Sequence, residues 1–265
     1  MREQLHGTTL VPGVDTLDPS HGRLFVVIGV FDGLHRGHIY LLRHLVAEAR
    51  ARGARPAVIT FDHHPDEVLT GAAPPLLCDP EERLARLAAA GVEVTVVQHF
   101  DVALRMTEYD AFVRRIAARV DLAGFLMTPD SAFGHDRRGT PAAVSGLGRE
   151  LAYEVVVVPS LELDGRPVRS TEIRTAIAEG DLAHAAHLLG RSYALVGTAS
   201  TVTPSGAQMT FPMPVALPPA GSYGVRVVGA GSGPGFESTA AIDDGGRVTV
   251  PGLPHDAGQL RVEFD

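Results

Sequence analysis

The sequence predicts an α/β fold, a doubly wound parallel sheet followed by a small β-barrel-like domain. Up to residue 190, continuous apolar runs of strand length alternate with segments of helical spacing, whereas residues 191–265 carry short runs between Gly- and Pro-rich turns. Strands that are buried on both faces read as continuous apolar runs, so the first pattern indicates a parallel sheet covered by helices. The second pattern is typical of a small barrel or sandwich.

The elements of the first part follow one another in regular alternation. Strands are expected at residues 24–30, 56–61, 92–97, 122–127 and 154–158, all of them buried. Helices are expected at residues 38–52, 79–90, 108–120, 141–151, 171–179 and 182–189. Ser170 and Asp181 are expected to cap the last two helices, and Gly180 and Gly190 to end them. Residues 1–22 show no clear period.

The pattern changes after Gly190. Turns at residues 201–208, 218–221, 229–235 and 243–246 separate short runs such as 223–228 and 247–250. We therefore place a domain boundary near residue 190, with a first domain over residues 1–190 and a small β domain over residues 191–265.

Composition excludes several classes of protein. The chain has 31 acidic and 23 basic residues, a net charge of −8 and no basic block, so no nucleic-acid partner is expected. No apolar run approaches the roughly 20 residues that span a bilayer, and the first ten residues lack the pattern of a signal peptide, which predicts a cytoplasmic protein without a membrane partner. Every one of the 23 cations is Arg, which excludes lysine Schiff-base chemistry and a P-loop lysine. The single cysteine, Cys78, excludes an internal disulfide framework.

The most informative segment, GVFDGLHRGH, runs from Gly29 to His38 and joins a predicted strand to a predicted helix. A helix N-terminus at the carboxyl end of a parallel strand favours an anion. Gly37 would let a phosphate approach the backbone, and His35 and His38 can stabilise charge on a phosphorus under attack. A loop with two surface histidines is the competing interpretation, which the strand–loop–helix context disfavours. No nearby side chain completes a ligand set, so no protein metal site is predicted.

This segment resembles the adenylyltransferase module of bacterial bifunctional riboflavin kinase/FAD synthetases, within the HxGH nucleotidyltransferase superfamily. Three further segments resemble motifs of that family in the same order: residues 60–65 (TFDHHP), 130–139 (DSAFGHDRRG) and 168–174 (VRSTEIR). The resemblance covers most of residues 20–190 and implies a Rossmann-like sheet. It also implies a transferase that moves AMP from its substrate ATP to FMN, releasing pyrophosphate and forming FAD, with Mg²⁺ as cofactor.

The resemblance implies a role for each matching residue. His35, His38 and Arg174 would act in catalysis on the nucleotide phosphates. The nucleotide site would be formed by Gly29, Phe31, Asp32, Gly33, Ser170 and Thr171. The flavin site would be formed by Phe61, His64, Pro65, Asp130, Phe133, Gly134 and Arg137. Simpler interpretations remain open: Arg174 and Arg137 as solvated arginines, and Phe61 as a core residue.

Three positions depart from the family's pattern. Ser131 stands where an aromatic residue is usual, His63 replaces a proline, and Arg169 replaces a serine. The nucleotide half is therefore better matched than the acceptor half, which leaves the choice between ATP and CTP and the identity of the acceptor open. One alternative is a nucleotidyltransferase that acts on another phosphate or phosphonate acceptor in specialised metabolism. A second alternative is a non-catalytic nucleotide- or flavin-binding protein.

Residues 211–215 (FPMPV) stand where the family's kinase barrel has a P-T-A-N phrase that serves magnesium and ATP. Pro212 is kept, but no hydroxyl or amide side chain follows it, and the sequence ends at Asp265, before most of that barrel's later strands. We therefore expect residues 191–265 to be a degenerate, shortened kinase domain without riboflavin kinase activity. Such a domain can support the first one or form a contact in a homo-oligomer.

Overall fold

The computed structural model describes residues 4–5, 7–203, 206–229, 235–252 and 258–265. The chain forms two compact units. Unit 1 comprises Met1–Phe31, Gly37–Pro74 and Glu81–Pro167, and unit 2 comprises Asp32–Arg36, Pro75–Pro80 and Val168–Asp265. These compact units do not coincide with the two domains predicted from the sequence. The domain boundary near residue 190 stays a prediction.

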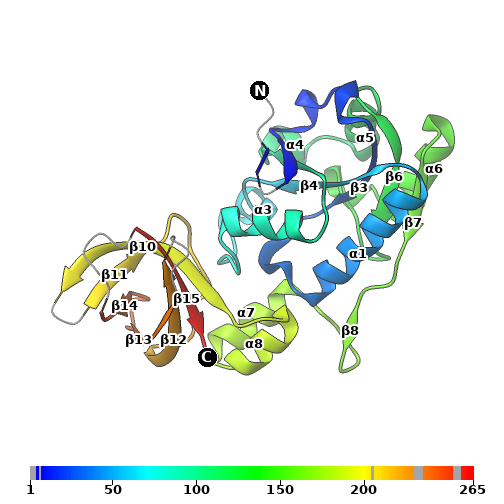
Figure 1. Ribbon diagram of the computed structural model, residues 1–265. Coiled ribbons are helices and arrows are strands. Elements are labelled where there is room, and N and C mark those ends of the chain that lie inside the picture. The colour runs from blue at the N-terminus through cyan, green and yellow to red at the C-terminus, as the bar shows by residue number, and fades with distance from the viewer. Residues whose placement is uncertain (1–3, 6, 204–205, 230–234, 253–257) are drawn as a thin grey trace. The chain divides into compact units, whose positions relative to one another are not determined.

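Unit 1 is built on a seven-stranded sheet of order β1-β2-β5-β4-β3-β6-β7 (Figure 1). β1 pairs antiparallel with β2, and the remaining neighbours pair in parallel, which confirms the predicted sheet. The strands are β1 (Gln4–Leu5), β2 (Thr8–Val11), β3 (Arg23–Ile28), β4 (Arg55–Phe61), β5 (Val94–Gln98), β6 (Asp121–Met127) and β7 (Glu154–Val157). The chain winds from β3 through β4 to β5 and then crosses to β6, so the topological switch point lies between β3 and β6.

Helices cover both faces of this sheet. They are α1 (Arg36–Ala51), α2 (Pro65–Thr70), α3 (Pro80–Ala89), α4 (Val102–Arg105), α5 (Tyr109–Ala117) and α6 (Pro141–Leu151). Phe112 and Ile116 of α5 share a buried core with Val26 of β3 and Ile59 of β4. The alternate strand residues point to the opposite face, where α1 lies along the sheet (Figure 1) and buries Leu42, Leu45 and Ala49.

The first 22 residues contain more structure than their lack of a clear period predicts. Thr9 of β2 lies opposite Val94 of β5, and the short 3-10 helices Val14–Thr16 and Pro19–His21 follow β2. A strand of four residues is too short to show its period in the sequence. Helices α2 and α4 were not predicted either.

One expectation about burial is wrong. The strand predicted at residues 154–158 forms as β7, but β7 is the edge of the sheet and Val157 is 47% exposed. A continuous apolar run is therefore not sufficient to show that a strand is central. The hairpin β8 (Glu162–Leu163) and β9 (Arg166–Pro167) completes unit 1.

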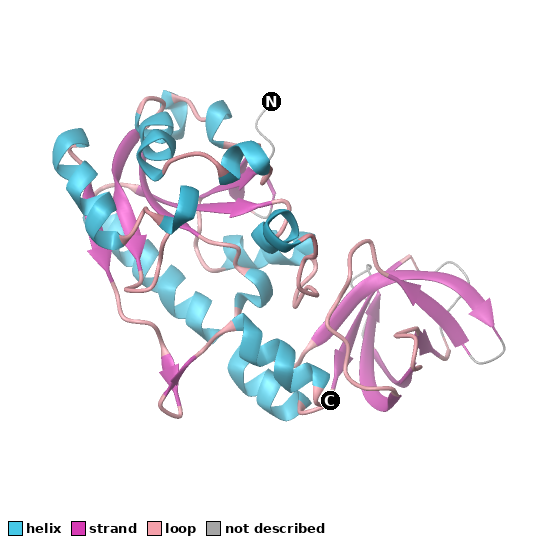
Figure 2. Cartoon of the chain, turned by 180° about the vertical axis from the view of Figure 1, so that it is seen from behind, coloured by secondary structure: helices cyan, strands magenta, loops and turns pink. Residues whose placement is uncertain are grey.

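In unit 2 the helices α7 (Ser170–Ala178) and α8 (Leu182–Leu189) pack together and precede a barrel. Six strands close this barrel in the order β10-β11-β14-β13-β12-β15, which confirms the predicted small barrel-like domain. Figure 2 shows the strands of this unit in magenta. They are β10 (Ala194–Thr203), β11 (Gly206–Thr210), β12 (Gly221–Gly229), β13 (Phe236–Ile242), β14 (Val248–Val250) and β15 (Gln259–Phe264). The predicted turn residues 204–205 and 230–234, and residues 1–3 and 6 at the chain start, lie outside the described residues.

The expected helix caps hold in part. Asp181 caps α8, because its carboxylate accepts a hydrogen bond of 2.9 Å from the His184 backbone N–H, and Gly190 ends α8 in the left-handed conformation. Ser170 is not the cap of α7: it is the first helical residue, and Arg169 holds the cap position without a side-chain hydrogen bond. The expectation for Ser170 is therefore wrong by one position.

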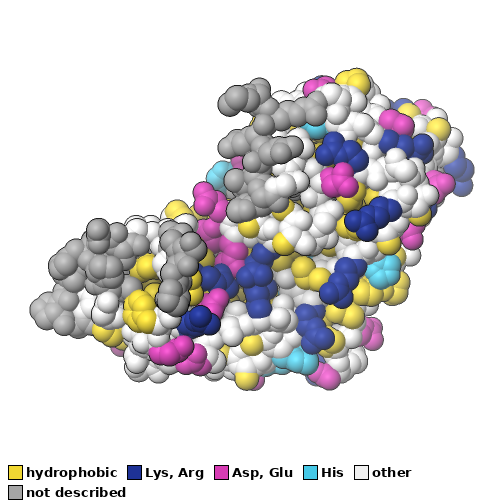
Figure 3. Space-filling model, in the orientation of Figure 1, with side chains coloured by type: hydrophobic (Ala, Val, Ile, Leu, Met, Phe, Trp, Pro, Cys, Tyr) yellow, Lys and Arg dark blue, Asp and Glu magenta, His cyan; other side chains and the backbone are white. Residues whose placement is uncertain are grey.

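The surface carries charges of both signs. Figure 3 shows arginine and carboxylate side chains interspersed over the visible face. Arg52, for example, pairs with Glu48 at 2.5 Å and with Glu154 at 2.8 Å. Among the residues that the structure describes, no helix is long and apolar enough to cross a membrane.

Candidate functional site

The loop after β3 has an unusual backbone. Phe31 and Leu34 have φ angles of 55° and 40°, a conformation that side chains other than glycine rarely adopt, and Gly33 between them has a φ of 76°. A Cβ at Gly33 would lie 3.0 Å from the Leu77 side chain, so this position needs glycine for both reasons. Strained backbone of this kind concentrates at functional sites.

The two histidines of the HxGH phrase belong to different compact units. In unit 1, His38 lies in the first turns of α1 and its ring packs at 54° against Phe31, with centroids 5.1 Å apart. A Cβ at Gly29 would lie 3.1 Å from the same Phe31 ring. Phe31, which the resemblance placed in the nucleotide site, is thus a buried support for His38 and Gly29.

In unit 2, Asp32 is the centre of a buried polar cluster. Its side chain is 3% exposed, and its carboxylate accepts hydrogen bonds from the Leu77 backbone N–H at 3.0 Å and from Arg174 Nη2 at 2.5 Å. The Asp32 carbonyl oxygen accepts a bond of 3.2 Å from Ser170 Oγ. The structure therefore brings Asp32 and Ser170 of the predicted nucleotide site together with Arg174, which was predicted to act in catalysis.

Arg174 is not the solvated helix arginine of the simpler interpretation. Its side chain is 15% exposed, and its Nε donates to the Pro75 carbonyl oxygen at 2.8 Å, while Nη2 pairs with Asp32. Two of its three nitrogens thus fix the loop after β3 and residues 75–77. Thr171, the next predicted residue, is exposed in the first turn of α7.

Among the histidines of unit 2 that the structure describes, His35 has the most strongly shifted pKa. It is 4% exposed, and burial lowers its pKa to about 4, with Arg191 and Arg174 adding charge repulsion. His35 is therefore neutral at physiological pH and can donate one N–H while it presents one acceptor nitrogen. Arg191 was not predicted, yet it donates to the Gly33 carbonyl oxygen at 2.7 Å. Its position directly after a helix-ending glycine gives no signal of this role.

Unit 1 contains a large cavity at the carboxyl ends of its central strands. Its volume is about 550 Å³. It opens at the switch point between β3 and β6, where open α/β sheets bind their ligands. The predicted residues that line it are Gly29, Phe61, Pro65, Asp130, Phe133, Gly134 and Arg137. His64 is not among the lining residues, and its Nδ1 caps α2 by accepting from the Asp66 backbone N–H.

Aromatic rings form part of the cavity wall. Phe61 and Phe100 meet edge to face with centroids 5.2 Å apart, and Phe133 lies 6.2 Å from both Phe112 and Phe125. Offset and edge-on packing of this kind suits a flat ring system as ligand. Phe100 and Phe112 were not predicted, although Phe100 follows a strand end in the sequence as Phe61 ends one.

Polar groups line the rest of the cavity. Arg105, His135 and Arg137 lie in its wall, and Arg137 Nη2 donates to the Asp130 carbonyl oxygen at 3.2 Å. Asp136 and Arg137 both have left-handed backbones, with φ angles of 52° and 56°. Arg105 was missed because nothing in the sequence connects it with the loop over residues 130–137.

Ser131 also lines the cavity, and its hydroxyl has a structural role. Ser131 Oγ accepts a hydrogen bond of 2.9 Å from the Thr128 backbone N–H and lies 2.7 Å from Thr128 Oγ1. Thr128 Oγ1 in turn donates to Asp130 Oδ1 at 2.8 Å. Ser131, which stands in place of an aromatic residue, therefore closes a hydrogen-bonded turn with Thr128, and this turn shapes the wall of the cavity.

Two further residues of unit 1 support the cavity. Arg83 of α3, 8% exposed, donates to the Val30 carbonyl oxygen at 3.2 Å and to the Phe61 carbonyl oxygen at 2.9 Å, and so holds the ends of β3 and β4 together. Gly134 approaches α5 closely, because a Cβ there would lie 2.6 Å from the Tyr109 nitrogen. Gly134 is thus required by packing as well as by its place in the wall.

The segment over residues 211–215 lies in unit 2 against residues 76–80. Leu76 N donates to the Pro214 carbonyl oxygen at 2.8 Å, and Ala216 N donates to the Leu76 carbonyl oxygen at 2.9 Å. The cavity that Pro212 and Met213 line measures about 10 Å³, the size of one water molecule.

Comparisons with known proteins agree with this picture. Residues 17–172 match the model of the FAD synthetase family. The chain is 31% identical over 254 residues to the bifunctional riboflavin kinase/FMN adenylyltransferase of Escherichia coli K12, covering 92% of this chain and 80% of that protein. It is 33% identical over 191 residues to the protein of the same description from Pseudomonas fluorescens, covering 71% and 61%.

A solved structure shows the same fold. A Streptococcus pneumoniae protein described as a macrolide-efflux protein superposes with a TM-score of 0.79 at 22% identity, over 96% of this chain and 88% of that chain. The family match extends over more than half of the chain and confirms the predicted nucleotidyltransferase class. The chain therefore belongs to the FAD synthetase family.

Proposed function

We propose that this chain transfers AMP from ATP to FMN and forms FAD and pyrophosphate. The observation that supports FMN as the acceptor is the cavity of about 550 Å³ in unit 1. Pockets of roughly 300–1,000 Å³ with apolar walls and a few convergent polar groups bind small molecules. Phe61, Phe100 and Phe133 suit a flavin ring, and Arg105 and Arg137 offer donors to its carbonyl or phosphate oxygens.

The reaction needs alignment more than acid–base chemistry. An oxygen of the FMN phosphate attacks the α-phosphorus of ATP, and the bond between that phosphorus and the bridging oxygen breaks, so that pyrophosphate leaves. The attacking oxygen is already an anion and needs no general base. The protein's part is to hold both phosphates in line and to stabilise the charge that develops between them.

We assign this stabilisation to the HxGH phrase and the start of α7. His35 would act as a neutral hydrogen-bond donor, since its pKa of about 4 keeps it uncharged. His38 would donate from the first turns of α1. Ser170 and Thr171 open α7, whose N-terminal N–H groups and dipole favour a phosphate. Arg174 would act on the reaction by holding Asp32 and Pro75 in place.

Mg²⁺ would enter with the phosphates of ATP. It prefers oxygen ligands and usually keeps several waters beside substrate phosphates. Asp32, Ser170 and Thr171 offer side-chain oxygens in unit 2, and the Asp32 carboxylate is already engaged by Leu77 N and Arg174. These residues fit an ion held mainly by the triphosphate, whose charge it neutralises when bound.

A substrate panel tests the proposal. ATP or CTP is combined with Mg²⁺ and either FMN or another phosphate or phosphonate acceptor, and pyrophosphate and the coupled product are measured. FAD formation from ATP and FMN supports the proposal. Pyrophosphate release only with another acceptor would favour the alternative that the Ser131 turn suggests, in which the pocket is shaped for a different acceptor. Nucleotide binding without turnover would favour a binding protein.

We also propose that the barrel has no riboflavin kinase activity. Met213 and Val215 offer no side-chain oxygen to Mg²⁺, and residues 214–216 are hydrogen-bonded to Leu76. Incubation with riboflavin, ATP and Mg²⁺ should yield no FMN, and clear turnover would refute this part of the proposal.

The remaining assignments concern the setting of the protein. We propose a cytoplasmic enzyme that acts on small molecules and has no nucleic-acid or membrane partner, consistent with its net charge of −8. The barrel can also form a contact in a homo-oligomer. Sedimentation of the purified chain measures its oligomeric state.

A further inference from the structure

Two histidines and a carboxylate meet at the ends of β4 and β5. Phe61 and Gln98 are the last paired residues of these parallel strands, and Asp62 N extends the pairing with a bond of 3.3 Å to the Gln98 carbonyl oxygen. Asp62 and His99 therefore leave adjacent strand ends side by side. His63 follows Asp62, and one nitrogen of each imidazole and one Asp62 oxygen all lie within 4.8 Å of one another.

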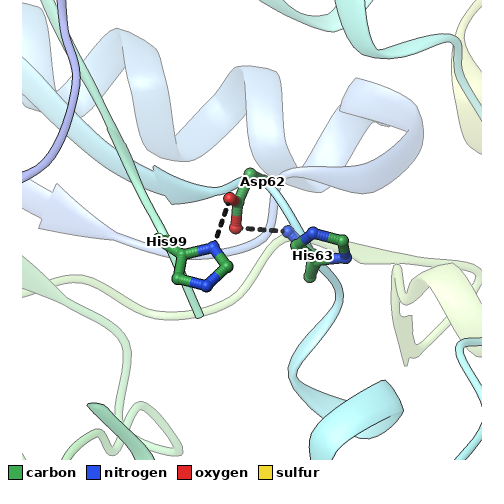
Figure 4. A group of neighbouring side chains, drawn as sticks. All are labelled: Asp62, His63 and His99. Carbon is green, nitrogen blue, oxygen red and sulfur yellow. Dashed lines mark hydrogen bonds and ion pairs between the residues drawn. The ribbon is translucent and has the colours of Figure 1, made fainter. Parts of the chain in front are cut away.

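Local hydrogen bonds fix the direction of this carboxylate. Asp62 Oδ1 accepts from His63 N at 2.7 Å and from Phe100 N at 3.1 Å, which holds it against the backbone. Asp62 Oδ2 faces His99 Nδ1 at 2.7 Å. Figure 4 shows the carboxylate between the two imidazole rings. The Asp62 side chain is thus oriented toward the position between the histidines.

His63 is oriented from the other side. Its Nδ1 lies 3.2 Å from Glu67 Oε2, one helical turn further on in α2. A metal-binding histidine commonly donates its second ring N–H to a carboxylate, which fixes the tautomer and raises the basicity of the other nitrogen. With Nδ1 held by Glu67, Nε2 of His63 is the nitrogen that can bind an ion.

We propose that Asp62, His63 and His99 bind a divalent transition metal of the Zn²⁺ type, with Glu67 as the carboxylate behind His63. Two imidazoles and one carboxylate are a donor set for zinc and its neighbours, whereas Mg²⁺ prefers oxygen ligands alone. Zinc at about 2.0–2.1 Å from each ligand needs the ligand atoms roughly 3.3 Å apart. The side chains can close this distance, because 46% of His63 and 62% of His99 are exposed.

The metal would replace a proton. His99 Nδ1 and Asp62 Oδ2 share one hydrogen in their bond of 2.7 Å, and a metal between them requires that nitrogen to be deprotonated. Three protein ligands leave a coordination position for water or for a ligand atom.

The site borders the wall of the large cavity. Phe61 precedes Asp62 and Phe100 follows His99, and both rings line the cavity in edge-to-face contact. A bound ion would join the ends of β4 and β5 directly behind these rings. We therefore expect metal binding to stabilise this part of the wall, independently of which acceptor the cavity takes.

Titration of the full chain with ZnCl₂ tests the proposal. Calorimetry should show saturable binding at one equivalent. Co²⁺ as a second probe should give the visible absorption of a nitrogen- and oxygen-ligated ion. Millimolar Mg²⁺ should not compete.

Variants locate the ion. His99→Gln and Asp62→Asn should abolish saturable binding, and Glu67→Gln should weaken it by roughly 10–100-fold, as removal of an outer-shell carboxylate does. His184→Gln is the matched control, since His184 is also an exposed surface histidine near a second one, His187, and near Glu172. It should bind Zn²⁺ as the wild type does.

Thermal unfolding with EDTA shows whether each variant is folded, and His99→Gln should match the wild type because the His99 side chain is largely exposed. Added Zn²⁺ should then raise the unfolding temperature of the wild type and of His184→Gln, and leave that of His99→Gln and Asp62→Asn unchanged. Absence of saturable Zn²⁺ binding overturns the proposal. So does binding that survives in His99→Gln or is lost in His184→Gln.

Discussion

Arg174 Nη2 lies 2.5 Å from Asp32 Oδ2, although 142 positions separate the two residues in the sequence. Both side chains are largely withdrawn from solvent, with exposed fractions of 15% and 3%. The pair joins the loop after β3 to α7, and its two residues come from the GVFDGLHRGH and VRSTEIR segments.

Loss of Arg174 should therefore destabilise the protein. Removing one partner of a buried pair leaves an uncompensated charge and costs about 3–5 kcal/mol. We expect Arg174→Met to lower the free energy of unfolding by this amount in urea denaturation, and Arg174→Met with Asp32→Asn to recover a large part of it. Arg138→Met is the control, because the Arg138 side chain is itself 58% exposed where it pairs with Glu108, and it should change the free energy of unfolding by less than about 1 kcal/mol. An equal effect of the two single variants would contradict this account of the pair.

The histidines of the HxGH phrase should control turnover. We expect His35→Gln and His38→Gln each to lower kcat by on the order of 10²–10³, the cost of removing one donor to a developing charge. His44→Gln serves as control, because His44 also lies on α1 but its Nδ1 is bound to the Tyr40 carbonyl oxygen. Steady-state rates with ATP and FMN measure the effect. An unchanged kcat in both variants would remove them from the catalytic site.

The sequence predicted the sheet and much of the candidate site because those features rest on local patterns. Apolar runs mark β3, β4 and β6, and fixed short spacings mark the HxGH phrase and the loop after β6. A short strand such as β2 leaves no such pattern, and its place beside β5 depends on pairing between residues more than 80 positions apart. Burial of β7 was wrongly expected for the same reason: the sequence does not show which strand is at the edge.

Contacts between residues that are far apart in the sequence could not be predicted. Arg191 on Gly33, Arg83 on Val30 and Phe61, and Arg105 in the cavity wall are arginines whose neighbours in the sequence give no hint of these contacts. Arg174 was singled out from its motif as a phosphate ligand, but only the structure shows that Asp32 and Pro75 hold it.

The buried His35 should make stability depend on pH. Its folded pKa of about 4 lies below the unfolded value of 6.5, so the unfolded chain binds the extra proton. The stabilisation is complete above pH 6.5 and is lost as the pH falls toward 4. Between pH 7.5 and pH 5 the wild type should lose roughly 2 kcal/mol more than His35→Gln. Urea denaturation at both pH values measures the difference, and equal losses would show that His35 titrates normally.

Ser131 should limit the affinity for flavin. An aromatic contact contributes roughly 0.5–1.5 kcal/mol beyond burial, which corresponds to about threefold to tenfold in affinity. We expect Ser131→Phe to strengthen FMN binding by this factor in calorimetric titration. Ser131→Ala is the control for loss of the hydrogen bonds to Thr128. Weaker FMN binding in Ser131→Phe would indicate a pocket shaped for a smaller acceptor.

The products of the reaction decide whether this chain transfers AMP to FMN. Purified chain, ATP, Mg²⁺ and FMN are incubated, and FAD and pyrophosphate are quantified together. We expect FAD and pyrophosphate in equal amounts, with FAD formation reduced by on the order of 10²–10³ in His35→Gln. Pyrophosphate without FAD, or no product from a chain that retains its fold, would contradict adenylyl transfer to FMN.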